Sequence, residues 1–178
     1  MIKFDSTFFL EPLFPFFSLQ TGVKANDFVD IIGWLGPFII MTISIYSLWN
    51  QRYLYGYLFF YVFASFTNAL LKNIFKQARP TNGRSIMNEE YSGVQQYGMP
   101  SYHAQSCMYS IVFLYLVKKS PYLLLIELFI LAATLYQRWF YRRHTVEQLG
   151  VGIGVGSIIG YLGYFVTTQF LVTNPSIQ

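Results

Sequence analysis

Charged residues are scarce in this sequence: they make up 11% of its 178 residues, less than half of the ~25% that is typical of soluble domains. Hydrophobic residues make up 54% and aromatic residues 20%. A chain so rich in aromatics and so poor in charge is not intrinsically disordered. It also carries too little polar surface to cover a soluble globule, so we expect an integral membrane protein.

Cysteine and histidine are also rare. The single cysteine, Cys107, excludes a disulfide scaffold, and neither it nor the two histidines have the spacing of a zinc site. We therefore expect neither a metal nor another cofactor.

Long apolar runs separated by short polar breaks predict an all-α membrane bundle that forms a single domain over residues 1–178. The runs lack the polar face of an amphipathic soluble helix, and spanning the hydrocarbon core takes about 20 residues. Two of the runs are shorter than this, at about 104–117 and 121–137. The five predicted spans are 28–49, 53–71, 104–117, 121–137 and 146–172.

An earlier apolar patch, at 7–19, is short and is interrupted by Glu11, Pro12 and Pro15. We expect it to be an interfacial or re-entrant segment. The alternative is a sixth span.

The net charge of +4 is concentrated rather than spread. Five spans place the loops at 50–52 and 118–120 on one side of the membrane and those at about 73–103 and 138–145 on the other. A nucleic-acid-binding protein would carry a broad basic stripe on a soluble face, so no nucleic-acid partner is expected. Seven of the twelve cationic residues fall near the second pair of loops, which suits a small anion: Lys72, Lys76, Arg79, Arg84, Arg138, Arg142 and Arg143.

The remaining loops suggest an orientation. Arg52, Lys118 and Lys119 mark the first side as cytoplasmic by the positive-inside tendency. The anion site is then predicted on the non-cytoplasmic, lumenal or periplasmic, face.

The first candidate site segment is Lys72 to Pro80. Lys72 and Arg79 are two helical turns apart and would share a face with Lys76. Pro80 disfavours helix at the residue before it, so the helix is predicted to end at Arg79 and to leave its guanidinium able to bind a tetrahedral oxyanion. The alternative is that these cations reach to the lipid headgroups.

Two further segments each carry a histidine at a helix start. In Pro100-Ser101-Tyr102-His103, Ser101 is a good N-cap, and the backbone N–H groups of a first helical turn bind anions. His144 follows Arg138 by six residues and directly precedes Thr145, which with Gln148 fits a capping box. Gln148 could orient the His144 imidazole, and so could Glu147.

Together, these residues surround one anion with lysine, two arginines, helix N–H groups and two histidines. One histidine can attack phosphorus while the other transfers protons, which is sufficient for phosphoryl transfer through a phosphohistidine. Fixed cations would stabilise the developing charge, so no metal is required.

Lys72-x6-Arg79-Pro80, Pro100-Ser101-x-His103 and Arg138-x5-His144 resemble, in order, the three signature motifs of the type 2 phosphatidic acid phosphatase (PAP2) superfamily. The resemblance implies His144 as nucleophile and His103 as acid to the leaving oxygen, then base toward water. It also implies a phosphate cradle formed by Lys72, Arg79, Ser101, Tyr102 (through its N–H) and Arg138.

Two positions depart from the common family pattern, with Tyr102 where glycine is usual and Gln148 where aspartate is usual. Glutamine at that position is the habit of some branches, notably those similar to dolichyl diphosphatases and to glucose-6-phosphatases. The former branch is also matched by Leu71-Lys72-Asn73, Tyr97-Gly98-Met99-Pro100-Ser101, His103-Ala104-Gln105 and His144-Thr145-x-x-Gln148.

The resemblance therefore implies a phosphatase that converts a polyprenyl or dolichyl diphosphate to the monophosphate. One alternative is a phosphatase for phosphatidate, phosphatidylglycerol phosphate or a sugar phosphate. A transferase with another acceptor and a non-catalytic phospholipid-binding scaffold are weaker alternatives. Only Tyr102 and Gln148 favour the scaffold.

Three features have no predicted part in catalysis. Glu127 is expected to be protonated or paired inside the bundle, because an ionised carboxylate in mid-span costs about 2.5–3.5 kcal/mol. Gly152, Gly156 and Gly160 predict a seam for close helix packing. The polar loop 81–99, which includes Glu89 and Glu90, is of the kind that often forms a lid.

Overall fold

The computed structural model describes residues 28–84 and 91–172, and this part of the chain is helical. Its only β-type pairing is an isolated antiparallel bridge between Ala78 and Tyr97. The 7–19 segment lies outside the described residues, as do Glu89 and Glu90. The elements are α1 (Phe28–Ser47), α2 (Tyr53–Phe75), the 3-10 turn η2 (Gly93–Gln96), α3 (Tyr102–Lys118), α4 (Pro121–Phe140), α5 (Val146–Thr167) and the π turn η3 (Thr168–Val172).

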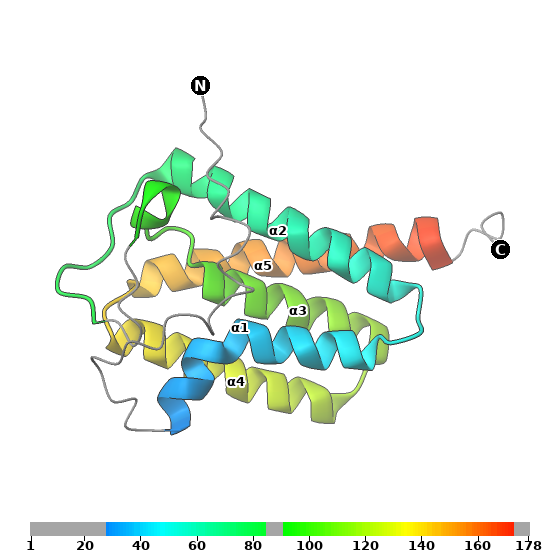
Figure 1. Ribbon diagram of the computed structural model, residues 1–178. Helices are drawn as coiled ribbons and strands as arrows, with labels where there is room; N and C mark the ends of the chain where they lie inside the picture. Colours follow the sequence, from blue (N-terminus) through cyan, green and yellow to red (C-terminus); the bar gives the residue numbers. More distant parts are fainter. Residues whose placement is uncertain (1–27, 85–90, 173–178) are drawn as a thin grey trace.

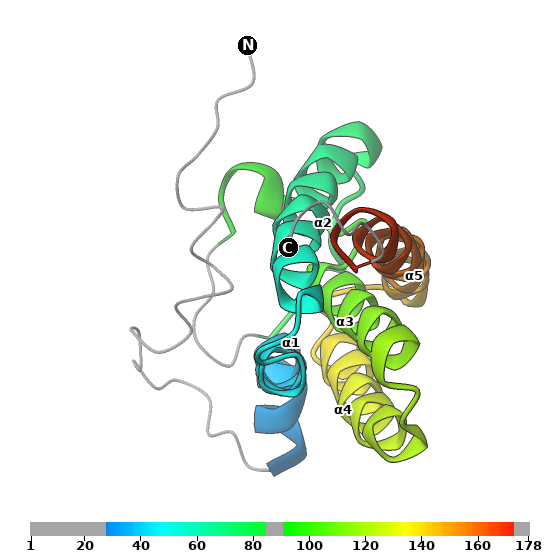
Figure 2. The ribbon, with the colours of Figure 1, turned by 90° about the vertical axis from the view of Figure 1, so that its right-hand side faces the viewer.

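The five long helices form one bundle with α3 at its centre. Figure 1 shows them running alongside one another, and the end view in Figure 2 shows α3 between α1, α2, α4 and α5. Helix α3 packs against all four of the others and most extensively against α5. This explains how α3 carries polar residues such as Gln105, Ser106 and Ser110, all buried against protein rather than lipid.

The five helices correspond to the five predicted spans. Four of them, α1, α2, α4 and α5, are long and apolar enough to cross a membrane, whereas α3 has 17 residues. Large apolar side chains such as Phe59, Leu125 and Phe129 are exposed on the outer faces. This outward hydrophobicity is consistent with a multi-pass membrane protein.

Glycines of α5 form a seam against α3, as the sequence predicts. A Cβ at Gly152 would lie 2.7 Å from the Ser101 carbonyl oxygen, and a Cβ at Gly156 would collide with the carbonyl of Gln105. Helix α5 therefore approaches the α3 backbone directly. This contact brings the two helix N-termini together, and the Ser101 N–H donates to the Gln148 carbonyl at 3.0 Å.

Glu127 is buried in the bundle, with 1% of its surface exposed. Neither of its carboxyl oxygens has a hydrogen-bond partner among the described residues. An isolated carboxylate without a partner is strongly unfavourable in an apolar interior. Of the two expected states, the neutral acid therefore fits the surroundings better than an ion pair.

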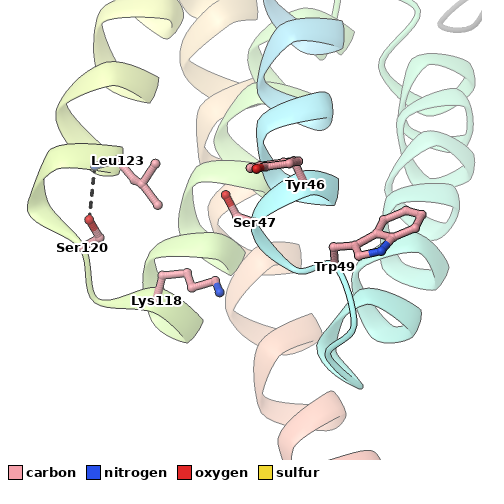
Figure 3. A pocket seen from close by; sticks show the side chains of 6 residues that line it. All are labelled: Tyr46, Ser47, Trp49, Lys118, Ser120 and Leu123. Atoms are coloured by element: carbon pink, nitrogen blue, oxygen red, sulfur yellow. Dashed lines mark hydrogen bonds between the residues drawn. The ribbon is translucent and has the colours of Figure 1, made fainter.

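The two ends of the bundle differ. The α1–α2 turn and the α3–α4 turn lie at one end, and the residues between α2 and α3 and between α4 and α5 lie at the other (Figure 1). Both histidine-bearing segments are thus at the same end. The opposite end has an open groove of about 480 Å³ with one cation and no histidine (Figure 3), lined by Tyr46, Ser47, Trp49, Lys118, Ser120 and Leu123.

Candidate active site

The segment after α2 corrects the sequence prediction. The helix ends at Phe75, four residues before Arg79, because Lys76 adopts a left-handed conformation (φ 47°) and its N–H donates to the Lys72 carbonyl at 2.9 Å. Beyond it, the Gln77 carbonyl accepts from the Gly98 N–H at 2.8 Å. The predicted helix end at Arg79 is therefore wrong. Lys76 is exposed and Arg79 lies beyond the helix, so the predicted shared face with Lys72 is wrong as well.

Lys72 and Arg79 are nevertheless held close together, because both donate hydrogen bonds to Gln95 of the η2 turn. The fully buried Lys72 donates from Nζ to Gln95 Oε1 at 3.0 Å and to the Tyr97 carbonyl at 2.9 Å. Arg79 donates from Nε to the Gln95 carbonyl at 3.0 Å. Gln95 thus positions both cations. No pattern in the sequence distinguishes it from the other polar residues of its loop.

The imidazole of His144 has one well-defined tautomer. The residue is 4% exposed, and its Nδ1 lies 2.9 Å from the Gly98 carbonyl and 3.2 Å from Gln148 Oε1, both acceptors. Its Nε2 lies 3.0 Å from Arg79 Nη1, which can only donate. The proton therefore resides on Nδ1, and the lone pair on Nε2 faces Arg79.

Gln148 completes this arrangement and forms the predicted capping box with Thr145. Its Oε1 also accepts from the Thr145 N–H at 3.2 Å, while its Nε2 donates to the Ala78 carbonyl at 2.8 Å and to Gln77 Oε1 at 2.9 Å. These backbone partners fix which end of the amide faces His144. Glu147 is exposed, so Gln148 rather than Glu147 makes the orienting contact.

Ser101 is the N-cap of α3, as predicted, but its side chain makes no capping hydrogen bond. Its Oγ is buried, with no partner among the described residues, in a residue that is 0% exposed. Tyr102 begins the helix, and its hydroxyl shares a hydrogen bond of 3.1 Å with Ser65 Oγ on α2. The Tyr102 side chain therefore reaches toward α2, while its backbone stays beside Ser101.

Arg138 and His103 form a second arginine–histidine contact. Arg138 lies in the last turn of α4, is 2% exposed, and donates from Nη2 to His103 Nε2 at 2.7 Å. Each histidine of the site therefore presents an Nε2 lone pair to a guanidinium. Neutral imidazole at both positions fits these contacts.

The surrounding charge favours an anion. Burial lowers the pKa of His144 well below its ordinary value of 6.5, and the positive charges of Arg79, Lys72 and Arg138 lower it further. His144 is thus neutral at pH 7, with its Nε2 lone pair available. Within residues 28–84 and 91–172, no three His, Cys, Asp or Glu side chains lie close enough to hold a metal ion.

Arg143 and Tyr91 border the site, and the sequence did not predict either as a site residue. Arg143 is 7% exposed and donates from Nε to the Tyr91 hydroxyl at 3.0 Å. The Tyr91 ring centroid lies 4.3 Å from Arg143 Cζ and 3.8 Å from Arg79 Cζ. The Arg143 carbonyl also accepts from Arg79 Nη1 at 3.0 Å. The only feature of the sequence that could have indicated Arg143 as a site residue is its position within a cationic run.

The predicted site residues thus converge at one end of the bundle from four helices and their loops. A family model described as the PAP2 superfamily matches residues 53–174. This match covers more than half of the chain, and the chain therefore belongs to the PAP2 superfamily. The matched region includes every residue of the candidate site.

Among curated proteins, the chain is similar to Dolichyldiphosphatase 1 of Dictyostelium discoideum. The two are 32% identical over 114 residues, which is 58% of this chain and 47% of the relative. The chain thus spans less than half the length of this relative. No solved structure gives a significant match.

Proposed function

We propose that this protein is a membrane phosphatase that hydrolyses a polyprenyl or dolichyl diphosphate to the monophosphate and inorganic phosphate. Membership of the PAP2 superfamily and the similarity to a dolichyldiphosphatase support this proposal. The observation that carries it is the neutral His144 imidazole, held through Nδ1 by Gly98 and Gln148, with its Nε2 lone pair directed at Arg79.

In the first step, the terminal phosphoryl group binds between the two arginines. Arg79 and Arg138 exchange their imidazole contacts for phosphate oxygens, which are stronger acceptors. The Nε2 lone pair of His144 then attacks the terminal phosphorus while the bond to the bridging oxygen breaks. His103, which gains a proton when the anionic substrate binds, transfers it to the departing oxygen of the lipid monophosphate.

In the second step, His103 accepts a proton from water as the water attacks the phosphohistidine. The bond from phosphorus to Nε2 breaks, inorganic phosphate leaves, and His144 returns to its neutral form. Throughout, Gln148 holds the Nδ1 proton in place. Lys72, the Ser101 hydroxyl and the Tyr102 N–H complete the cradle, and the buried Ser101 Oγ is a donor suited to a phosphate oxygen.

The proposed site faces the non-cytoplasmic side, because Arg52, Lys118 and Lys119 belong to the turns at the other end of the bundle. The substrate would then reach the site from the lumenal or periplasmic leaflet.

Phosphate release from a polyprenyl diphosphate by the detergent-solubilised full chain in EDTA tests the proposal. We expect turnover in EDTA, no turnover for His144→Ala, and a loss of about 10²–10⁴-fold for His103→Ala. Glu147→Gln changes an exposed neighbour of the site and is the matched control. An alkaline quench with substrate labelled in the terminal phosphate should trap label on the unsubstituted protein but not on His144→Ala.

Each part of the proposal can fail separately. Full turnover by His144→Ala would refute the nucleophile, and activity that disappears in EDTA would refute the metal-free mechanism. Faster turnover of phosphatidate, phosphatidylglycerol phosphate or glucose phosphate than of the diphosphate would assign the site to one of those substrates instead.

A further inference from the structure

Arg143 is a buried cation at the edge of the site that the proposed mechanism does not use. It directly precedes His144, and at 7% exposure its side chain is withdrawn from solvent. Its neighbour Arg142 is exposed.

Tyr91 holds Arg143 near the reacting centre. The Tyr91 hydroxyl accepts from Arg143 Nε at 3.0 Å, and its ring contacts the guanidinium groups of both Arg143 and Arg79. The Cζ atom of Arg143 lies 4.3 Å from the ring centroid and that of Arg79 lies 3.8 Å from it. The separation of these two Cζ atoms is therefore at most the sum of the two distances. Arg79 in turn touches the Nε2 atom of His144.

This upper limit on the separation of the two guanidinium groups is compatible with the two phosphates of a diphosphate. In a diphosphate, the second phosphorus is separated from the first by a single bridging oxygen. A terminal phosphate on Arg79 would therefore leave the second phosphate within reach of a neighbouring guanidinium. An arginine fork binds phosphate oxygens in pairs, which favours arginine over a point charge in such a position.

We propose that Arg143, positioned by Tyr91, forms a subsite for the second phosphate of a diphosphate substrate and so makes the enzyme prefer diphosphates to monophosphates. This inference rests on the proposed function for the identity of the substrate. A monophosphate offers Arg143 no group to bind, so the residue acts on selectivity.

Binding of inorganic pyrophosphate and of inorganic phosphate to the full chain in detergent tests the subsite without requiring turnover. Arg143→Gln should weaken pyrophosphate binding about 10- to 100-fold, the range expected for hydrogen bonds to a charged group. Phosphate binding should weaken by less than about threefold, since Arg79 and Arg138 remain. Arg142→Gln, the matched control, should change neither.

Two further variants separate binding from folding. Arg143→Lys keeps the charge without the fork and should fall between Arg143→Gln and the unsubstituted protein. Tyr91→Phe keeps the ring but removes the hydroxyl acceptor, and it should weaken pyrophosphate more than phosphate. An equal loss of both ligands in Arg143→Gln, or pyrophosphate binding that is unchanged, would overturn the subsite.

Turnover distinguishes this inference from the proposed function. If the unsubstituted protein releases phosphate from a polyprenyl diphosphate and Arg143→Gln loses equal activity on diphosphate and monophosphate, only the subsite is refuted. If the protein binds pyrophosphate through Arg143 but hydrolyses no lipid phosphate, the proposed function is refuted and the subsite stands.

Discussion

Replacing Gln148 by glutamate tests whether the site requires an amide at this position. The change conserves size but exchanges the Nε2 donor for an oxygen, which would face the Ala78 carbonyl at 2.8 Å and Gln77 Oε1 at 2.9 Å. Gln77 can turn its own amide to donate, whereas the Ala78 carbonyl cannot change roles. One part-buried backbone acceptor therefore loses its donor.

The expected loss of stability follows from that single carbonyl. The Ala78 carbonyl is part-buried in this contact, so the loss of its donor costs about 0.5–1.5 kcal/mol, the net contribution of one hydrogen bond. Each kcal/mol lowers the melting temperature of a chain of this size by about 2–4 °C. A carboxylate beside Nδ1 would also favour the imidazolium form of His144 and raise its pKa. Gln148→Glu should therefore melt earlier and lose more activity at pH 6 than at pH 8.

Thermal melting in detergent and phosphate release across pH measure these two effects. Glu147→Gln, on the same helical turn but exposed, should leave both unchanged. If Gln148→Glu kept the melting temperature and the pH profile of the unsubstituted protein, the amide orientation deduced from Ala78 and Thr145 would be wrong.

Three other predictions follow from the packing and charge of the site. A Cβ at Gly98 would collide with the Gln148 amide, so Gly98→Ala should lower kcat by about 10²-fold through misplacement of His144; unchanged kcat would contradict this. Gly156→Ala should cost about 1–3 kcal/mol in thermal unfolding, because its Cβ meets the α3 backbone. Gly154→Ala, where a Cβ meets nothing within 4 Å, should be neutral or stabilising by about 0.5–1 kcal/mol. The pKa of His144 in the folded protein lies well below 6.5, so below about pH 6.5 the unfolded chain binds more protons than the folded protein does. The free energy of unfolding should therefore fall as the pH drops below about 6.5, by at most about 1.4 kcal/mol per pH unit. His144→Gln should abolish that dependence in melts recorded against pH.

Features that depend on local chemistry could be predicted from the sequence. Thr145 and Gln148 form a capping box because both partners lie within one helical turn. The apolar runs become the five helices, since a spanning segment must satisfy its own backbone hydrogen bonds wherever its neighbours lie. The glycine seam of α5 follows likewise from the repeated spacing of Gly152, Gly156 and Gly160.

The end of α2 could not be predicted, because a contact distant in the sequence determines it. Pro80 by itself predicts a helix end at Arg79, but the backbone around Gln77 pairs instead with the returning segment at Gly98. Lys72 and Arg79 lie close together, as the sequence predicts, but not by the predicted geometry. Gln95, rather than a shared helix face, brings them together.

The sequence alone thus determined the apolar helices of the bundle and placed the two histidine-bearing segments at one end of it, because helix length, capping and composition act over short stretches of chain. Only the tertiary structure decided which nitrogen of His144 carries the proton, that Gln148 rather than Glu147 contacts it, and that Arg143 and Tyr91 border the site. Gln148 lies only four residues from His144, but its amide is oriented by Gln77 and Ala78, and the other outcomes likewise depend on hydrogen bonds between residues far apart in the chain. Such partners become neighbours only once α3, α4 and α5 have packed together.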